Sequence, residues 1–184
     1  MEPDDENGLV KLISRMEIKV DDKASCTRIF IDGIMVDQEL RKEKISKLSS
    51  IVSQHHIVRA HLLRVQRDLV KHIGTGAIFE GRDIGTVVFP KAPLKIFVTA
   101  NSRTRAQRRF EEIQKAHGTA TFDEILESIE KRDDRDKNRT TAPMQKAADA
   151  EVIDTSNMTI DEVMDKTLDL INVAQKKYQG AQLW

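Results

Sequence analysis

The chain has 184 residues, of which 39% are hydrophobic and 33% are charged, with 30 Lys and Arg against 30 Asp and Glu. This composition is typical of a soluble globular domain with a small additional lobe, and it excludes the membrane and disordered classes. The zero formal charge argues against a general nucleic-acid binder, because such proteins usually carry a basic excess.

The first residues and the single cysteine indicate the compartment. Residues 1–8, "MEPDDENG", are acidic and polar, unlike a signal peptide, and we expect them to form a solvated tail. Cys26 cannot form an internal disulfide, which favours a reducing cytoplasm. No apolar run approaches the ~18–20 residues of a membrane-spanning helix, so no membrane association is expected.

Residues 9–75 predict a small lobe with a β-hairpin and helices. The segment "LVKLISRMEIKV" begins with a helical pattern and then becomes strand-like. In "TRIFIDGIMV", two β-rich pieces flank Asp32-Gly33, the dipeptide of a type I′ turn. Apolar residues then recur every three or four positions over about 38–73, which predicts one long helix that ends at the following glycines.

The rest of the chain predicts an α/β arrangement. "AIFEG" and "LKIFVTA", within residues 76–100, are short apolar runs typical of buried parallel strands, and "AEVIDTS" is a third. Helical patterns cover about 102–117, 122–138 and 159–178, so 101–145 forms an arginine-rich helical region and 146–184 the last strand and helix. The expected fold is α/β: an open, mostly parallel sheet with helices on both faces, and a smaller N-terminal lobe.

The stretch "GAIFEGRDIGTVVFP" contains two glycines five positions apart, followed by Arg82. A phosphate loop needs G-x-x-x-x-G-K-[ST], whereas this stretch has a β-prone middle and ends in Arg82-Asp83. We interpret it as a strand that presents Glu80, Arg82 and Asp83 at its carboxyl end, where open α/β sheets bind ligands. An ordinary strand-to-loop exit is the alternative.

The run "KRDDRDKNR" places Arg132, Asp136 and Arg139 at helical positions i, i+4 and i+7, on one face, and Asp133 and Lys137 on another. Guanidinium groups beside a carboxylate suit a phosphorylated polyol, because arginine binds phosphate oxygens and a carboxylate accepts from hydroxyls. A solvated, salt-bridged helix surface is the alternative.

A second basic cluster lies in "SRTRAQRR", and it contains Arg103, Arg105, Arg108 and Arg109. It could hold a triphosphate or RNA, and the alternative is a surface helix whose charges Glu111 and Glu112 balance. The five histidines show no metal-ligand spacing, so we expect no protein-bound metal site.

Taken together, "EGRDIGTVVFPKAPLKIFVTA", "RTRAQRR", "KRDDRDKNRTTAP" and "AEVIDTS" resemble the bacterial cytidylate kinase family in order and spacing. The resemblance extends from about Leu9 to the C-terminus. It implies the parallel α/β fold of the P-loop nucleoside monophosphate kinases with a nucleotide-monophosphate lobe. It also implies a monomer that transfers the terminal phosphate of ATP, with Mg²⁺, to CMP or dCMP.

The resemblance also implies roles for individual residues. Residues similar to the family's cytosine-reading positions are Asp83, Arg59 and Arg139. Sugar-contacting positions are matched by Ser50, Arg132 and Asp136, and Arg82 matches a phosphate-contacting arginine. Among these, Arg82, Asp83 and Arg132 are the expected catalytic residues, while Arg105 and Arg109 lie near the family's lid over ATP.

The printed sequence departs from the family in one respect, since it contains no G-x-x-x-x-G-K-[ST] motif. We therefore expect the chain to be N-terminally incomplete, to hold the CMP-binding half of the site, and to lack catalysis. A non-catalytic CMP-binding protein is the alternative. We also expect uncovered strand edges and apolar helix faces, and with them poor solubility.

Overall fold

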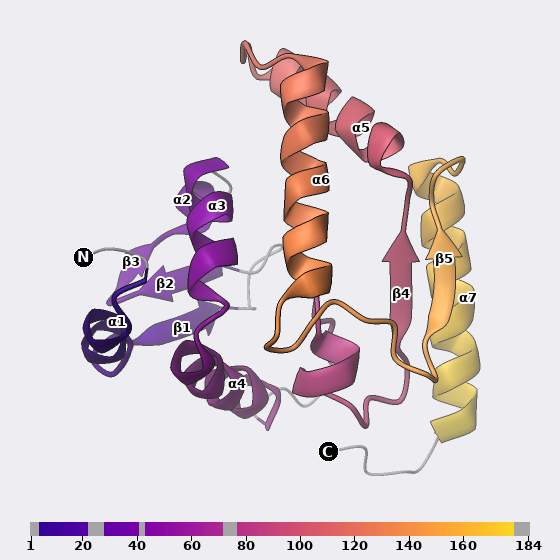
Figure 1. Ribbon diagram of the computed structural model, residues 1–184. Coiled ribbons are helices and arrows are strands. Elements are labelled where there is room, and N and C mark those ends of the chain that lie inside the picture. Colours follow the sequence, from indigo (N-terminus) through magenta and orange to yellow (C-terminus); the bar gives the residue numbers. More distant parts are fainter. Residues whose placement is uncertain (1–3, 22–27, 41–42, 72–76, 179–184) are drawn as a thin grey trace. The chain divides into compact units, whose positions relative to one another are not determined.

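The computed structural model describes residues 4–21, 28–40, 43–71 and 77–178, and it divides the chain into two compact units (Figure 1). The N-terminal unit comprises Met1–Phe79 and Arg139–Thr141. The C-terminal unit comprises Glu80–Asn138 and Ala142–Trp184. Residues 139–141, which directly follow the helix over Phe122–Asn138, therefore belong to the N-terminal unit.

A three-stranded antiparallel sheet forms part of the N-terminal unit, from β1 (Ile18–Asp21), β2 (Arg28–Ile31) and β3 (Ile34–Met35). Asp32 and Gly33 between β2 and β3 both have positive φ angles, 50° and 79°, as a type I′ turn requires. The predicted hairpin is therefore confirmed. The Asp32 carboxylate also accepts a hydrogen bond from the Glu17 backbone N–H at 2.8 Å, which joins the turn to the start of β1.

Helix α1 (Glu6–Ile13) begins inside the segment predicted as a tail over residues 1–8. Asp5 caps it, since the Asp5 carboxylate accepts from the Gly8 N–H at 2.9 Å. Leu9 and Ile13 are buried in a core cluster with Val58, which accounts for the helix forming so early in the chain.

Among the described residues, the helical region predicted over 38–73 contains three helices, α2 (Asp37–Leu40), α3 (Glu43–Val52) and α4 (His56–Lys71), while residues 41–42 and 72–73 lie outside the described part. The break between α3 and α4 has a local cause. The Ser53 hydroxyl and the Gln54 amide both donate to the Ser50 carbonyl, at 3.2 and 3.4 Å. These side-chain bonds compete with the helical backbone pattern, and the chain turns before α4 begins.

In the C-terminal unit, β4 (Ile96–Thr99) and β5 (Glu151–Asp154) pair in parallel, with Ile96 opposite Glu151. The helices are α5 (Ser102–Lys115), α6 (Phe122–Asn138) and α7 (Ile160–Tyr178). Figure 1 shows α5 and α6 side by side, and they pack against each other. Asn101 caps α5 by accepting from the Thr104 N–H at 2.7 Å. Two predicted strands, three predicted helices and the α/β class are thus confirmed.

The predicted strand "AIFEG" is wrong for the residues that the structure describes there, 77–81, while Gly76 lies outside them. Residues 77–80 do not form a strand, and Ile78 is 91% exposed. An apolar run becomes a strand only where a neighbouring strand satisfies its backbone groups. The chain instead continues into η1, a π-helix over Ile84–Val88, which the sequence did not predict.

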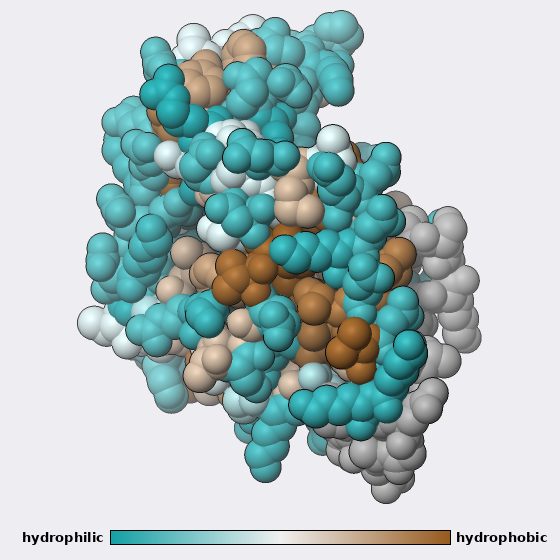
Figure 2. Space-filling view, turned by 90° about the vertical axis from the view of Figure 1, so that its right-hand side faces the viewer, coloured by the Kyte–Doolittle hydropathy of each residue, from teal (hydrophilic) through white to brown (hydrophobic). Residues whose placement is uncertain are grey.

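Large apolar side chains are exposed on the strands and the last helix of the C-terminal unit (Figure 2). On the strands, Val98 is 60% exposed and Val152 is 45% exposed. On α7, the exposed residues Ile160, Met164 and Leu168 recur every fourth position and so form one stripe. A contiguous exposed apolar patch promotes association, as expected from the sequence.

Replacing Met164 and Leu168 together with glutamine should reduce self-association of the chain. Both are about half exposed, at 54% and 48%, so their polar replacements cost little packing. Light scattering and size-exclusion chromatography at increasing protein concentration measure the effect. If aggregation and the melting temperature both stay unchanged in this variant, the stripe on α7 is not the surface through which the chain self-associates.

Helix α7 begins with a capping box, and the geometry of this box predicts that its stabilising effect is lost in acid. The Thr159 N–H and then its hydroxyl donate to Glu162 Oε2, at 2.7 and 3.0 Å, and hold the Glu162 pKa below its ordinary value near 4.5. Stability from a lowered pKa is present above the unfolded value and is lost as the pH falls through the folded value. In urea titrations, the wild-type advantage over Glu162→Gln should therefore hold from pH 7 to 5 and shrink below pH 4. A pH-independent difference would contradict this.

Candidate functional site

Asp136, near the end of α6, is the centre of an ionic cluster in the C-terminal unit. Its side chain is 5% exposed, and Oδ2 lies 3.0 Å from Arg82 Nε and 3.8 Å from Arg132 Nε. The two arginine side chains are 41% and 42% exposed. A buried carboxylate is stable only where cations or hydrogen bonds compensate it. Three of the predicted site residues are thus brought together, with the carboxylate inside and the guanidinium groups partly in solvent.

The backbone next to Arg82 is fixed by η1. Asp83 is 8% exposed, and its carbonyl accepts from the Val87 N–H at 2.8 Å and from the Thr86 and Val88 N–H groups at 3.3 Å. Gly81 is required for close packing here, since a Cβ at this position would lie 2.9 Å from Ile84 Cγ1. The glycine that seemed to belong to a phosphate loop therefore permits the chain to pack against the first turn of η1.

Three other predicted residues, Ser50, Arg59 and Arg139, belong to the N-terminal unit. Ser50 at the end of α3 is 6% exposed, and Arg139 is 9% exposed. Arg59 Nη1 donates to the Ser53 carbonyl at 3.4 Å, and Arg139 Nη1 lies 3.5 Å from the Ser53 hydroxyl oxygen. Ser53 therefore contacts two predicted site residues. Its position three residues after Ser50 is the only signal in the sequence that could have indicated this contact.

The predicted helical stripe of Arg132, Asp136 and Arg139 needs one correction. Helix α6 ends at Asn138, so Arg139 follows the helix instead of lying on its face. The physical reason is that the segment 139–141 packs in the N-terminal unit. Arg132 and Asp136 do lie one turn apart on α6, as the spacing predicts.

The arginines of α5 have partners within the C-terminal unit. Arg105 donates to both Asp133 carboxylate oxygens, at 3.1 and 2.5 Å, and to the Ala100 carbonyl at 3.1 Å. Arg108 donates to the Thr155 carbonyl at 2.6 Å. Arg109 pairs with Glu112 at 3.0 Å. Asp133 on α6 thus binds Arg105 on α5, although the sequence places Asp133 on the same helix face as Lys137. Arg105 and Arg108 therefore join α5 to the segments beside it.

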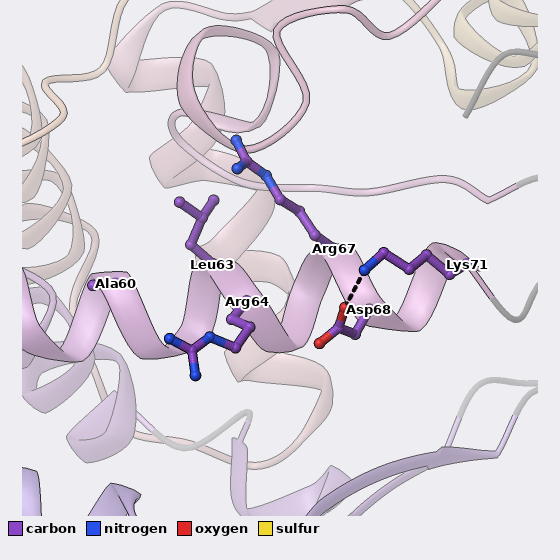
Figure 3. Close-up of a pocket in the computed structure, with 6 residues that line it drawn as sticks. All are labelled: Ala60, Leu63, Arg64, Arg67, Asp68 and Lys71. Carbon is purple, nitrogen blue, oxygen red and sulfur yellow. Dashed lines mark hydrogen bonds and ion pairs between the residues drawn. The ribbon is translucent and has the colours of Figure 1, made fainter.

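A shallow hollow of about 270 Å³ lies along α4 (Figure 3). In Figure 3, Arg64 and Arg67 point to different sides of the helix, and the Lys71 ammonium lies 2.7 Å from Asp68 Oδ1. None of the predicted site residues lines the hollow, whose wall consists of Ala60, Leu63, Arg64, Arg67, Asp68 and Lys71. We therefore assign the hollow no role in the candidate site.

Two further features are absent from the part of the chain that the structure describes. No group of three or more histidine, cysteine, aspartate or glutamate side chains there could hold a metal ion. No helix over those residues is long and apolar enough to span a bilayer.

The parallel α/β unit and the Arg82–Asp136–Arg132 cluster fit the class of nucleoside monophosphate kinases. Comparison with known proteins agrees: the family model described as cytidylate kinase matches residues 1–173. The chain is 43% identical over 162 residues to a cytidylate kinase of Halalkalibacterium halodurans, covering 88% of this chain and 72% of that protein. It is 40% identical over 166 residues to a cytidylate kinase of Vibrio cholerae, covering 90% and 73%. The chain belongs to the cytidylate kinase family.

Proposed function

We propose that the protein phosphorylates CMP or dCMP, with ATP and Mg²⁺ as the phosphate donor. The observation that supports this most directly is the buried Asp136 carboxylate held by Arg82 and Arg132. This combination suits a sugar phosphate, because the carboxylate accepts hydrogen bonds from hydroxyl groups and guanidinium groups bind phosphate oxygens. Family membership supplies the identity of the reaction.

In this proposal, the ionic cluster binds the sugar and the phosphate of CMP. The Asp136 carboxylate has more acceptor capacity than one ion pair uses, so it can also accept from a ribose hydroxyl, with Ser50 as a further sugar contact. Arg82 uses its Nε on Asp136 at 3.0 Å, and its side chain is 41% exposed. Its terminal guanidinium N–H groups then donate to the phosphate of CMP, and Arg132 provides a second cation there.

The base is read by Asp83, Arg59 and Arg139. Cytosine presents an amino donor beside two acceptors, so a carboxylate together with arginines is complementary to it. Uracil would place its O4 acceptor against the carboxylate and leave buried polar groups unsatisfied. A site that hydrogen-bonds its substrate in this way discriminates strongly against an analogue that lacks the matching donor.

Phosphoryl transfer passes through a loose transition state, and the protein contributes mainly position and charge stabilisation. Arg82, Asp83 and Arg132 are the residues we assign to the acceptor side of this step. Magnesium would belong to the ATP donor and would supply neutralisation of its phosphate charge. On the donor side, Arg109 is 42% exposed, and Arg105 would have to exchange its bond to Asp133 for one to a phosphate.

The test is a calorimetric titration of the chain with CMP, dCMP and UMP, followed by a coupled assay with ATP and Mg²⁺. We expect CMP or dCMP to bind more tightly than UMP. No binding of either cytidine nucleotide at millimolar concentration would overturn the proposal. The ratio of CMP to dCMP affinity then shows which of the two is preferred.

A second candidate function is CMP binding without phosphoryl transfer. One observation favours it, namely that the printed sequence contains no G-x-x-x-x-G-K-[ST] motif to hold the phosphates of ATP. If this candidate is right, the protein with this sequence binds CMP in calorimetry and produces no ADP in the coupled assay. CMP-dependent ADP formation by the same chain would reject it.

A further inference from the structure

The charged end of the Lys95 side chain is held in place by several contacts, although the proposed reaction assigns Lys95 no role. The side chain is 8% exposed. Its ammonium donates to the Pro90 carbonyl at 2.5 Å and to both Asp149 carboxylate oxygens, at 2.8 and 2.7 Å. Lysine is almost never this buried unless it is paired. The contacts therefore join segments 54 residues apart in the sequence.

The backbone of Lys95 is fixed as well. Lys95 directly precedes β4, and its carbonyl accepts from the Glu151 N–H at 2.9 Å, at the first residue of β5. The side chain thus leaves from the paired start of the parallel sheet, which is a rigid origin. The groups that the Lys95 side chain contacts are therefore held in position relative to the sheet.

The aliphatic part of Lys95 lies against η1. A Cβ built on Gly85, the second residue of η1, would lie 3.3 Å from Lys95 Cδ and 3.7 Å from the Ala147 Cβ. The ammonium then reaches Pro90, two residues beyond the last residue of η1. Lys95 therefore contacts this short helix within its first turn and just past its end.

A π-helix needs such support because it is a rare backbone conformation, and it occurs frequently at functional sites. In η1 the Asp83 carbonyl is shared by three N–H donors, from Thr86, Val87 and Val88, and two of these bonds are 3.3 Å long. This is a weak local pattern. The geometry of η1 therefore depends on the side chains that pack against it, and Lys95 contacts Gly85 within η1 and Pro90 just beyond its end.

We propose that Lys95 is a positioning residue for the nucleotide site: by bracing η1 against the sheet, it fixes Asp83 and the adjacent Arg82. Lys95 does not touch the nucleotide in this arrangement. The inference rests on the proposed function, in which Asp83 reads the base and Arg82 binds the phosphate. Loss of the brace lets the loop relax, and the affinity for CMP falls although every binding residue remains.

The partner of Lys95 supports this arrangement. The hydrogen bond from Lys95 is the main cause of a lowered Asp149 pKa, which shows that the pairing favours the ionised carboxylate. Because Asp149 is largely exposed while the Lys95 side chain is buried, substitution of the aspartate perturbs the brace from its solvent side. That gives a variant that does not alter the packing on Gly85.

The test compares Lys95→Met, Asp149→Asn and the control Lys91→Met in calorimetric titrations with CMP. Lys91 is an exposed lysine in the same loop, so its replacement makes the same change in net charge. We expect the dissociation constant for CMP to rise roughly tenfold in Lys95→Met, less in Asp149→Asn, and not in the control, since displacing a binding group by about 1 Å can cost up to ~100-fold. A merely structural role would reduce the number of binding sites and leave the dissociation constant unchanged.

Two further measurements separate the possible outcomes. Amide hydrogen exchange at Val87 and Val88 should be faster in Lys95→Met, which reports on the brace without any nucleotide. In a double-mutant cycle with Asp83→Asn, the Lys95→Met effect should be smaller than in the wild-type background, because part of it acts through Asp83. Additive effects, or equal CMP affinity of wild type and Lys95→Met, would overturn the inference alone. Absence of CMP binding by the wild type would instead overturn the proposed function, and the positioning role with it.

Discussion

Replacing Arg82 with methionine is expected to lower the free energy of unfolding of the C-terminal unit and to weaken CMP binding. Without Arg82, the buried Asp136 carboxylate keeps Arg132, whose Nε lies 3.8 Å away, as a neighbouring cation. Breaking a buried ion pair on one side typically costs 3–5 kcal/mol, and we expect about 2–3 kcal/mol because Arg132 remains. Urea denaturation followed by circular dichroism measures this loss.

The same change should weaken CMP binding by about 10- to 100-fold, the equivalent of one or two charge-assisted hydrogen bonds to the phosphate. Lys131→Met is the matched control. Lys131 lies on α6 beside Arg132 and pairs with Glu127 at 2.6 Å, but both side chains are about two-thirds exposed. Such surface pairs contribute about 1 kcal/mol or less. If both substitutions had equal effects on stability and binding, Arg82 would be an ordinary surface residue.

Replacing Asp83 with asparagine should change which nucleotide the protein prefers. Asp83 accepts from the cytosine amino group in the proposed arrangement, whereas an asparagine amide can also donate to the O4 of uracil. We expect the CMP to UMP affinity ratio to fall by about 100-fold or more, mainly through weaker CMP binding. Calorimetric titration with each nucleotide measures the ratio, and the stoichiometry reports the folded fraction.

Asp134→Asn is the control for Asp83→Asn, because Asp134 is an exposed carboxylate on α6 and its loss changes the net charge equally. The control should leave the CMP to UMP ratio unchanged. If Asp83→Asn weakened both nucleotides by the same factor, Asp83 would have a structural role in η1, and the base would be read elsewhere.

Local signals in the sequence predicted most of the elements. The hairpin at Asp32-Gly33 was predictable because only a few dipeptides adopt positive φ angles at both positions. The starts of α5 and α7 were predictable because their caps, Asn101 and the Thr159–Glu162 box, act within three residues. Where the determining interaction is this short in sequence, pattern and structure agree.

The wrong predictions all depend on interactions that a local pattern does not contain. The run at 77–80 has the composition of a strand, but a strand also needs a partner. The break between α3 and α4 depends on side-chain bonds to the Ser50 carbonyl. In the same way, η1 depends on the buried stem of Lys95, which is ten residues further along the chain than Gly85.

The candidate site was predicted unevenly for the same reason. The spacing of Arg132 and Asp136 indicated one helix face, and the structure agrees. That Arg82 would meet Asp136 could not be derived from spacing, since 54 residues separate them in the printed sequence. The base-reading assignments came from resemblance to the family, and they remain predictions until nucleotides are titrated.

The turn between α3 and α4 has a consequence for how this protein can evolve or be redesigned. Ser50 lies before the turn and Arg59 after it, and only Ser53, Gln54 and His55 separate the two helices. One inserted residue within α4 would rotate everything beyond it by about 100°. We therefore expect a residue inserted into α4 before Arg59 to behave as a loss-of-function allele, because it would rotate Arg59 away from the Ser53 carbonyl to which it donates.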